Sequence, residues 1–143
     1  MTNPIVLDAS AGVEMLLTTE VGRVIRERLP VAVEEWVPEI YLSEVAGTLR
    51  RAELSGRVRP ERAAIALGDL LAGPQRRVQV RTLLPEAGTL RHNLTINDAL
   101  YVVLARHLGA ALVTADMRLA KAPRHRDRSH RALRRRAGDP RTP

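Results

Sequence analysis

Four acidic residues lie where their carboxylates could act together on a substrate. Asp8 ends a short apolar run, and Asp116 comes two residues after a second such run. Asp98 lies at the start of an apolar helical stretch, and Glu44 lies within an amphipathic one. Several carboxylates that converge closely cannot all stay ionised unless a divalent cation offsets their repulsion. The four acids therefore suggest a metal site of hard oxygen ligands, which select Mg²⁺ or Mn²⁺.

Cysteine and histidine offer no comparable site. The chain has no cysteine, which excludes disulfides, thiolate-bound metals and a cysteine nucleophile and favours a reducing cytoplasm. Its four histidines, His92, His107, His125 and His130, include no HxxxH pair, so a zinc site is not expected. The motifs GxxxxGK[ST] and G-x-S-x-G are absent, which excludes P-loop and serine-hydrolase chemistry.

Each acid also has a purely structural interpretation. Asp8 and Asp116 could cap the helices that follow them. Asp98 lies three residues after Thr95, a spacing typical of a capping box, although a capped helix start can still present Asp98 to a site. Glu44 lies opposite the apolar stripe of its helix, where a solvated face would explain it. Taken singly, the residues leave these alternatives open.

Short apolar strands and amphipathic helices alternate along the chain. The first expected helix begins directly after Asp8. The alternation predicts an α/β fold with a parallel sheet covered on both faces, and sites in such sheets form at the carboxyl ends of strands. The expected strands are residues 4–7, 31–37, 78–83 and 111–114, and the other expected helices are residues 20–29, 40–54, 61–72, 95–108 and 117–121.

The chain is predicted to form one domain. Its 143 residues suffice for a sizeable core, and proline and glycine fall at element boundaries rather than in a linker. The longest apolar run, residues 99–105, is too short to cross a membrane, and residues 1–7 lack the basic start of a signal peptide. We therefore expect a soluble, unprocessed, cytoplasmic protein without a membrane partner.

The net charge of +7 is distributed unevenly. Residues 1–117 carry 13 Lys and Arg against 14 Asp and Glu, whereas residues 118–143 carry 10 against 2. Residues 123–143 contain Leu133 as their only large aliphatic side chain, a composition that does not offset chain entropy. We therefore expect a folded domain at residues 1–122 and a basic, largely disordered tail after it.

Four motifs follow one another along the chain: IVLDASA at residues 5–11; WVPE at 36–39 with LSEVA at 42–46 and LRR at 49–51; LTINDALYVVLA at 94–105; and LVTADMRLAKA at 112–122. They resemble those of the PIN-domain ribonucleases and, within them, the VapC-type toxins of bacterial toxin-antitoxin operons. The order and spacing of the motifs agree with the family from residue 3 to about residue 122, and the last two motifs are the most specific.

The resemblance implies a three-layer α/β/α sandwich, with a central, mainly parallel sheet, whose acidic cleft binds Mg²⁺ or Mn²⁺ and hydrolyses RNA. It assigns the catalytic acids to Asp8, Glu44, Asp98 and Asp116. In this arrangement a carboxylate-held metal would activate water for attack on a phosphodiester. Glu44 would orient that water or hold a second metal.

The same resemblance distinguishes metal ligands from residues that support them. Asp8 and Asp98 would bind the metal directly, and Asp116 would bind it directly or through water. Ser10 and Thr114 are candidates for hydroxyls that support these ligands. Helix capping or local backbone bonding is the alternative role for both hydroxyls.

Toxins of this family commonly form homodimers and are held by a VapB-type antitoxin. The C-terminal segment of the antitoxin wraps the toxin and can place a basic side chain in the acidic cleft. The resemblance implies these partners for this chain, with RNA as the substrate. The near-neutral charge of residues 1–117 is consistent with them, because an arginine would take over the electrostatic role of the metal.

The end of the chain departs from the family pattern. Family members close with one more short apolar strand, whereas residues 123–143 are rich in arginine, which leaves open whether the last edge strand is present. The tail could bind RNA phosphates, form an inert extension or result from an altered reading frame.

Two other classes of protein remain as alternatives. A non-catalytic RNA-binding protein on a PIN-like scaffold would use the arginine-rich tail, although three aromatic residues offer no stacking platform. A Mg²⁺-dependent phosphatase or receiver domain would need a further acid near Asp8, where the phosphatase position is Ser10. We therefore predict a metal-dependent endoribonuclease that acts as a growth-inhibiting toxin.

Overall fold

The computed structural model describes residues 2–116 and 119. This part of the chain contains one sheet of four strands in the order β3-β2-β1-β4, and every pairing is parallel. The predicted parallel sheet is therefore confirmed. Its strands are β1 (Asn3–Leu7), β2 (Val33–Pro38), β3 (Arg76–Val78) and β4 (Ala111–Val113).

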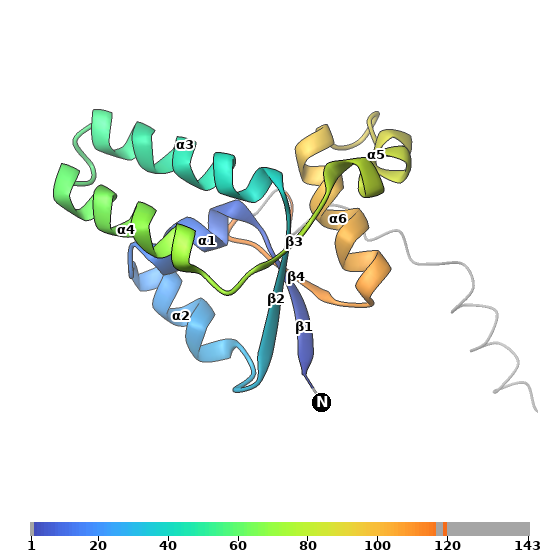
Figure 1. Ribbon diagram of the computed structural model, residues 1–143, viewed down its shortest axis with the longest axis horizontal. Helices are drawn as coiled ribbons and strands as arrows, with labels where there is room; N and C mark the ends of the chain where they lie inside the picture. Colours follow the sequence, from blue (N-terminus) through green and yellow to red (C-terminus); the bar gives the residue numbers. More distant parts are fainter. Residues whose placement is uncertain (1, 117–118, 120–143) are drawn as a thin grey trace, which may run out of the picture.

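Six helices of the described region cover the two faces of the sheet. Figure 1 shows α1 to α4 on one side of the strands and α5 with α6 on the other. This arrangement is the expected three-layer α/β/α sandwich. The helices are α1 (Ala9–Leu16), α2 (Glu20–Arg28), α3 (Ile40–Leu54), α4 (Pro60–Ala72), α5 (Val80–Thr89) and α6 (Ile96–Leu108).

The hydrophobic core joins the strands to helices on both faces. Val6 and Leu7 of β1 and Val37 of β2 are at most 1% exposed. They belong to the same buried cluster as Val45 of α3 and Leu104 of α6. Each such side chain stabilises the fold by about 1.5–3 kcal/mol through burial. The core therefore fixes the helices that carry Glu44 and Asp98 relative to the sheet.

The two ends of α6 follow directly from the local sequence. The Oγ1 of Thr95 accepts a hydrogen bond from the backbone N–H of Asp98 at 3.2 Å, which caps the start of the helix as expected. Gly109 ends the helix with a left-handed φ of 59°, which glycine adopts without steric cost. Capping and burial together hold Asp98 in the first turn of α6.

The prediction of a strand at residues 78–83 is wrong. The short strand β3 ends at Val78, and α5 follows almost at once. This helix buries Leu83 and Ala87, which lie four residues apart and therefore on one face. Short apolar runs fit a strand or a helix equally well, and Pro85 just after the run argues against a helix locally. The contact of α5 with α6 outweighs that local preference.

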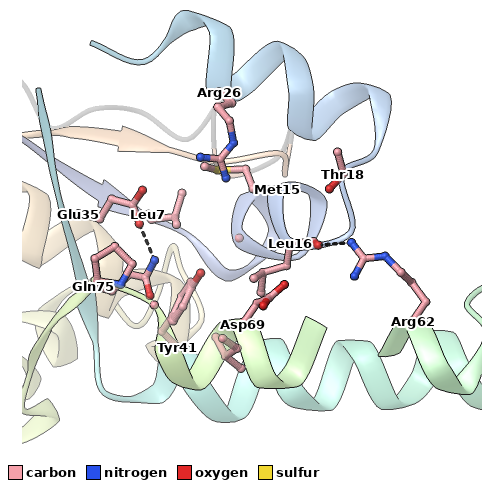
Figure 2. Close-up of a pocket in the computed structure, with 14 residues that line it drawn as sticks. Leu7, Met15, Leu16, Thr18, Arg26, Glu35, Tyr41, Arg62, Asp69 and Gln75 are labelled. Carbon is pink, nitrogen blue, oxygen red and sulfur yellow. Dashed lines mark hydrogen bonds between the residues drawn. The ribbon is translucent and has the colours of Figure 1, made fainter. Parts of the chain in front are cut away.

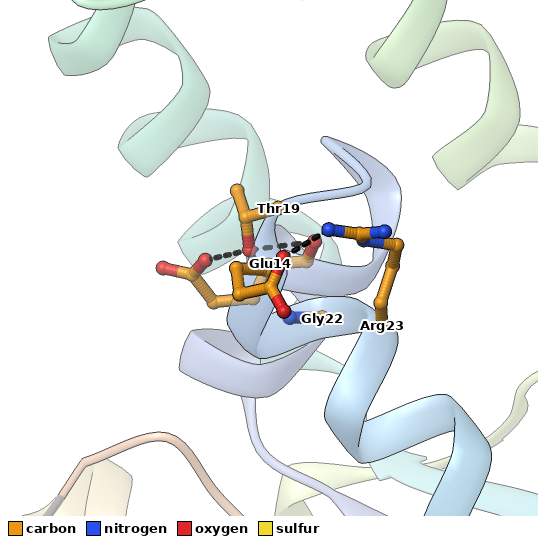
Figure 3. A network of polar contacts seen from close by, with 5 residues as sticks. Glu14, Thr19, Gly22 and Arg23 are labelled. Carbon is orange, nitrogen blue, oxygen red and sulfur yellow. Dashed lines mark hydrogen bonds and ion pairs between the residues drawn. The ribbon is translucent and has the colours of Figure 1, made fainter.

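Helices α1 and α2 meet at a tight corner. Thr18 has a left-handed φ of 53°, and Thr19 then caps α2 by accepting a hydrogen bond from the N–H of Gly22 at 3.1 Å. The same hydroxyl donates to the carboxylate of Glu14 in α1 (Figure 3). A Cβ on Gly22 would lie 2.1 Å from the carbonyl oxygen of Glu14, so the corner requires glycine.

Several predictions concern the end of the chain. The helix expected at residues 117–121, apart from Leu119, lies outside the described residues, as do the domain boundary after residue 122 and the tail at residues 123–143. The part of the chain where a last edge strand would lie is also outside the described residues. Within the described residues, no helix has the length and apolar character needed to span a bilayer.

Candidate active site

The carboxyl edge of the sheet brings together residues that are far apart in the sequence. β1 and β4 are parallel neighbours, with Leu7 opposite Val113. Asp8 and Thr114 directly follow these residues, and the N–H of Asp8 donates to the carbonyl of Val113 at 2.9 Å. The ends of the first and last described strands therefore meet at the edge where open parallel sheets form their sites.

Asp8 is a buried carboxylate held by two hydroxyls. The residue is 6% exposed. Ser10 Oγ donates to its Oδ2 at 2.6 Å, and Thr114 Oγ1 donates to the same oxygen at 2.9 Å. The side chain makes no capping hydrogen bond to α1, so the capping interpretation is wrong for this residue. Both bonds from the described residues fall on Oδ2, which leaves Oδ1 for a ligand.

The two hydroxyls also bind the segment that follows β4. Ser10 Oγ accepts a hydrogen bond from the N–H of Ala115 at 3.0 Å, and Thr114 Oγ1 accepts one from the N–H of Asp116 at 2.9 Å. The two hydroxyl oxygens are 3.2 Å apart. Ser10 and Thr114 therefore both support the carboxylate of Asp8 and bond the local backbone, so both of the expected roles are present. Together these hydrogen bonds place the backbone of Asp116 next to Asp8.

Glu44 lies on α3 with its side chain half-buried. The hydroxyl of Tyr101 on α6 donates to its Oε1 at 2.7 Å. Tyr101 itself is fully buried. The interpretation of Glu44 as part of a solvated face is therefore wrong, because a second helix supplies a buried partner for its carboxylate.

Three of the acids share one electrostatic environment. Burial raises the pKa of Glu44 above its ordinary value, and the negative charges of Asp8 and Asp98 raise it further. Hydrogen bonds from Tyr101 and Asn97 act in the opposite direction. Charges influence a pKa in this way only at short range, so the fold brings these three acids together.

The donor chemistry of this edge fits a hard divalent cation. Its acids supply only oxygen ligands, the type that Mg²⁺ and Mn²⁺ prefer. Within residues 2–116 and 119, no three histidine, aspartate or glutamate side chains already form a closed set around one point. Within the described residues, Asp8 and Asp98 are therefore close enough to Glu44 to repel its charge, but the acids do not already form a closed ligand set.

Two buried tyrosines border the acids, and the sequence patterns did not single them out. Tyr101 is 0% exposed and Tyr41 is 1% exposed. Burial raises the pKa of both phenols, and nearby carboxylates raise it further, so both stay protonated at neutral pH. Tyr101 lies three residues after Asp98 and thus on the same side of the helix. That spacing is the signal by which it could have been found.

Glu44→Gln is expected to stabilise the metal-free protein at pH 7. The folded state disfavours the ionised carboxylate, so the wild type loses stability as the pH rises through the raised pKa. The Tm advantage of the variant should therefore shrink on acidification, because wild-type Glu44 becomes neutral. At this chain length a change of about 1 kcal/mol in the free energy of unfolding shifts Tm by roughly 2–4 °C. Thermal denaturation of both proteins between pH 4.5 and 7.5 resolves a shift of this size. A lower Tm for Glu44→Gln than for the wild type at pH 7 would contradict the conclusion that the folded state disfavours the ionised carboxylate of Glu44.

A separate cavity of about 360 Å³ lies on the side of the sheet that α1 to α4 cover. At one end Gln75 Nε2 donates to Glu35 Oε2 at 2.5 Å, and at the other Arg62 Nη2 donates to the carbonyl of Leu16 at 2.6 Å (Figure 2). The lining holds two acids and two arginines, so it lacks the excess of negative charge found at the carboxyl edge. These four residues are Glu35, Asp69, Arg26 and Arg62.

Comparison with known proteins agrees with the four motifs. The PIN domain family matches residues 5–125. Ribonuclease VapC12 of Mycobacterium tuberculosis is 36% identical over 121 residues, which cover 85% of this chain and 93% of the relative. Ribonuclease VapC1 of the same species is 37% identical over 119 residues, which cover 82% of this chain and 90% of the relative.

Two solved structures share the fold. PAE2754 from Pyrobaculum aerophilum matches with a TM-score of 0.57 at 24% identity, covering 96% of this chain and 100% of that one. VapC20 of Mycobacterium tuberculosis, a toxin that cleaves the sarcin-ricin loop, matches with a TM-score of 0.59 at 19% identity, covering 83% and 95%. With the family match and the relatives above 35% identity, this chain belongs to the PIN-domain family and, within it, to the VapC-type ribonucleases.

Proposed function

We propose that this protein is a metal-dependent endoribonuclease that acts as the toxin of a type II toxin-antitoxin pair. The observation that carries the proposal is the group of Asp8, Glu44 and Asp98, where burial and mutual repulsion raise the pKa of Glu44. Such costly environments for charge are typical of functional sites, where a ligand of opposite charge offsets them. The relatives are named ribonucleases, which supports RNA as the substrate.

We assign distinct roles to the four acids. Asp8, Asp98 and Asp116 would hold Mg²⁺ or Mn²⁺, and Glu44 would orient water or hold a second ion. A bound divalent cation supplies an activated water and stabilises the charge that develops during phosphodiester hydrolysis. Two hydroxyls fix the carboxylate of Asp8 in advance, so it needs little reorganisation when a ligand binds.

Cleavage assays with the purified protein test the metal dependence. We expect cleavage of RNA in Mg²⁺ or Mn²⁺, loss of cleavage in EDTA, and recovery when the ion is restored. Cleavage that continues in EDTA would contradict the mechanism. Binding of RNA without cleavage in every condition would instead favour the alternative, a non-catalytic RNA-binding protein on a PIN scaffold.

We further propose two protein partners, a second copy of this chain and a VapB-type antitoxin. A basic side chain of the antitoxin would meet the acids of the carboxyl edge and take over the charge role of the cation. The proposal predicts a dimer in solution, which light scattering after size-exclusion chromatography measures. A monomer at micromolar concentration would contradict the homodimer.

A chain that ends at Ala122 is expected to keep its cleavage activity but to bind RNA more weakly at low salt. The shorter chain lacks eight arginines that could neutralise phosphates, whereas the acids of the site remain. Each phosphate contact that is lost should make the dependence of affinity on salt shallower. Binding of RNA to both chains between 50 and 200 mM salt measures this. Equal affinity and equal salt dependence would show that the tail does not contact the substrate.

A further inference from the structure

The hydroxyl of Tyr101 connects two of the elements that carry the acids. It donates to Glu44 Oε1 at 2.7 Å, from α6 to α3. Asp98 lies one turn before Tyr101 on the same helix. A single rigid helix thus carries both one of the acids and the group that holds a second acid.

The burial of this hydroxyl shows that packing alone does not explain the tyrosine. Tyr101 is 0% exposed, so phenylalanine would fill the same space without a polar group. A buried hydroxyl without a partner is costly, and the partner here is a carboxylate rather than a backbone carbonyl. A hydrogen bond to a charged acceptor is also stronger and more directional than one between neutral groups.

We propose that Tyr101 is a positioning residue, which fixes the carboxylate of Glu44 in the orientation that the proposed hydrolysis requires. Glu44 has a long side chain that is only half-buried, and two other carboxylates repel it. Asn97 at the start of α6 also donates to Glu44, but its hydrogen bond affects the carboxylate less than that of Tyr101. Without the hydroxyl of Tyr101, the side chain of Glu44 would turn away from Asp8 and Asp98 towards solvent. The hydroxyl of Tyr101 opposes this motion. The inference rests on the proposed function, because it gives that orientation a catalytic purpose.

The chain offers a matched control in Tyr41. This tyrosine is also buried, at 1% exposure, and it lies on α3 close to Glu44. Within the described residues its hydroxyl makes no hydrogen bond to a carboxylate, and it lies against Gly12, where an added Cβ would come within 2.2 Å of the hydroxyl oxygen. Figure 2 shows Tyr41 at the separate cavity. Removing this hydroxyl should therefore leave Glu44 in place.

The test compares Tyr101→Phe with Tyr41→Phe by steady-state cleavage of RNA in Mn²⁺. We expect Tyr101→Phe to lower kcat about tenfold, with KM changed less than twofold. Tyr41→Phe, whose hydroxyl lies near Asp8 but does not contact Glu44, should lower kcat by about threefold at most. Adding Tyr101→Phe to Glu44→Gln should cause no further loss, because the hydroxyl acts through Glu44. Equal kcat for the two tyrosine variants, or an additive loss in the double variant, would overturn the proposal.

A second readout does not depend on activity. NMR of protein with labelled glutamate measures the order of the Glu44 side chain in the metal-free state. We expect Tyr101→Phe to make this side chain mobile, whereas Tyr41→Phe leaves it ordered. If the wild type does not cleave RNA, the proposed function fails, and the NMR result still decides whether Tyr101 holds Glu44. An ordered Glu44 in Tyr101→Phe would overturn the positioning role even if the wild type cleaves RNA.

Discussion

Asp8→Asn is expected to lower the rate of RNA cleavage by at least about 100-fold, or about 2.7 kcal/mol of transition-state stabilisation. The substitution removes a negative charge and keeps the shape of the side chain. The amide oxygen of asparagine can still accept the hydrogen bonds that Ser10 and Thr114 donate to Oδ2 at 2.6 and 2.9 Å. A loss of kcat/KM in Mg²⁺ or Mn²⁺ would therefore report the missing charge, and circular dichroism would verify the fold.

Asp69→Asn provides the matched control for this experiment. Asp69 is an exposed acid on α4 that lines the separate cavity, so the substitution removes the same charge away from the carboxyl edge. We expect its cleavage rate to stay within about twofold of the wild type. Asp98→Asn should behave like Asp8→Asn. Wild-type rates in Asp8→Asn would exclude this residue from the mechanism.

Gly22→Ala is expected to destabilise the protein by about 1–3 kcal/mol or more. An added Cβ would lie 2.1 Å from the carbonyl oxygen of Glu14 and 2.9 Å from the backbone nitrogen of Met15. Both atoms belong to the backbone of α1, so no side-chain rotation relieves the clash, and the helices must move apart. Urea denaturation measures the change as a lower midpoint at an unchanged slope.

Gly68→Ala should shift stability in the opposite direction. Gly68 lies inside α4, and nothing lies within 4 Å of the position that its Cβ would occupy. Alanine is favoured over glycine in a helix interior by about 0.5–1 kcal/mol, so we expect a small gain. A Gly22→Ala variant as stable as Gly68→Ala would mean that the corner between α1 and α2 opens without cost.

The placement of Asp8 and Asp98 in the candidate site follows from local sequence signals. Thr95 identifies the start of α6, and that start determines where Asp98 lies. The apolar runs before Asp8 and Thr114 identify two parallel strands, whose carboxyl ends must share one edge once the strands are neighbours. These predictions succeed because each depends on a few adjacent residues and on one general rule of parallel sheets.

The remaining features depend on contacts between distant parts of the chain. The short run before Pro85 is compatible with a strand, and only the packing of α5 against α6 makes it helical. The hydrogen bond from Tyr101 to Glu44 joins residues 57 positions apart, and the hydrophobic pattern of α3 placed Glu44 on an apparently solvated face. Periodicity indicates which side of a helix is polar, but it does not identify what packs there.

We expect the hydrogen bonds around Asp8 to form late in folding. They join Asp8 and Ser10 to Thr114, which lies 106 and 104 positions further along the chain. Contacts over such separations form late, because the closure of long loops opposes them. A nascent chain that ends after α6 contains Asp8, Glu44 and Asp98, yet it lacks the strand whose end anchors Asp8. For a nuclease that acts as a toxin, this topology would delay activity until the domain is nearly complete.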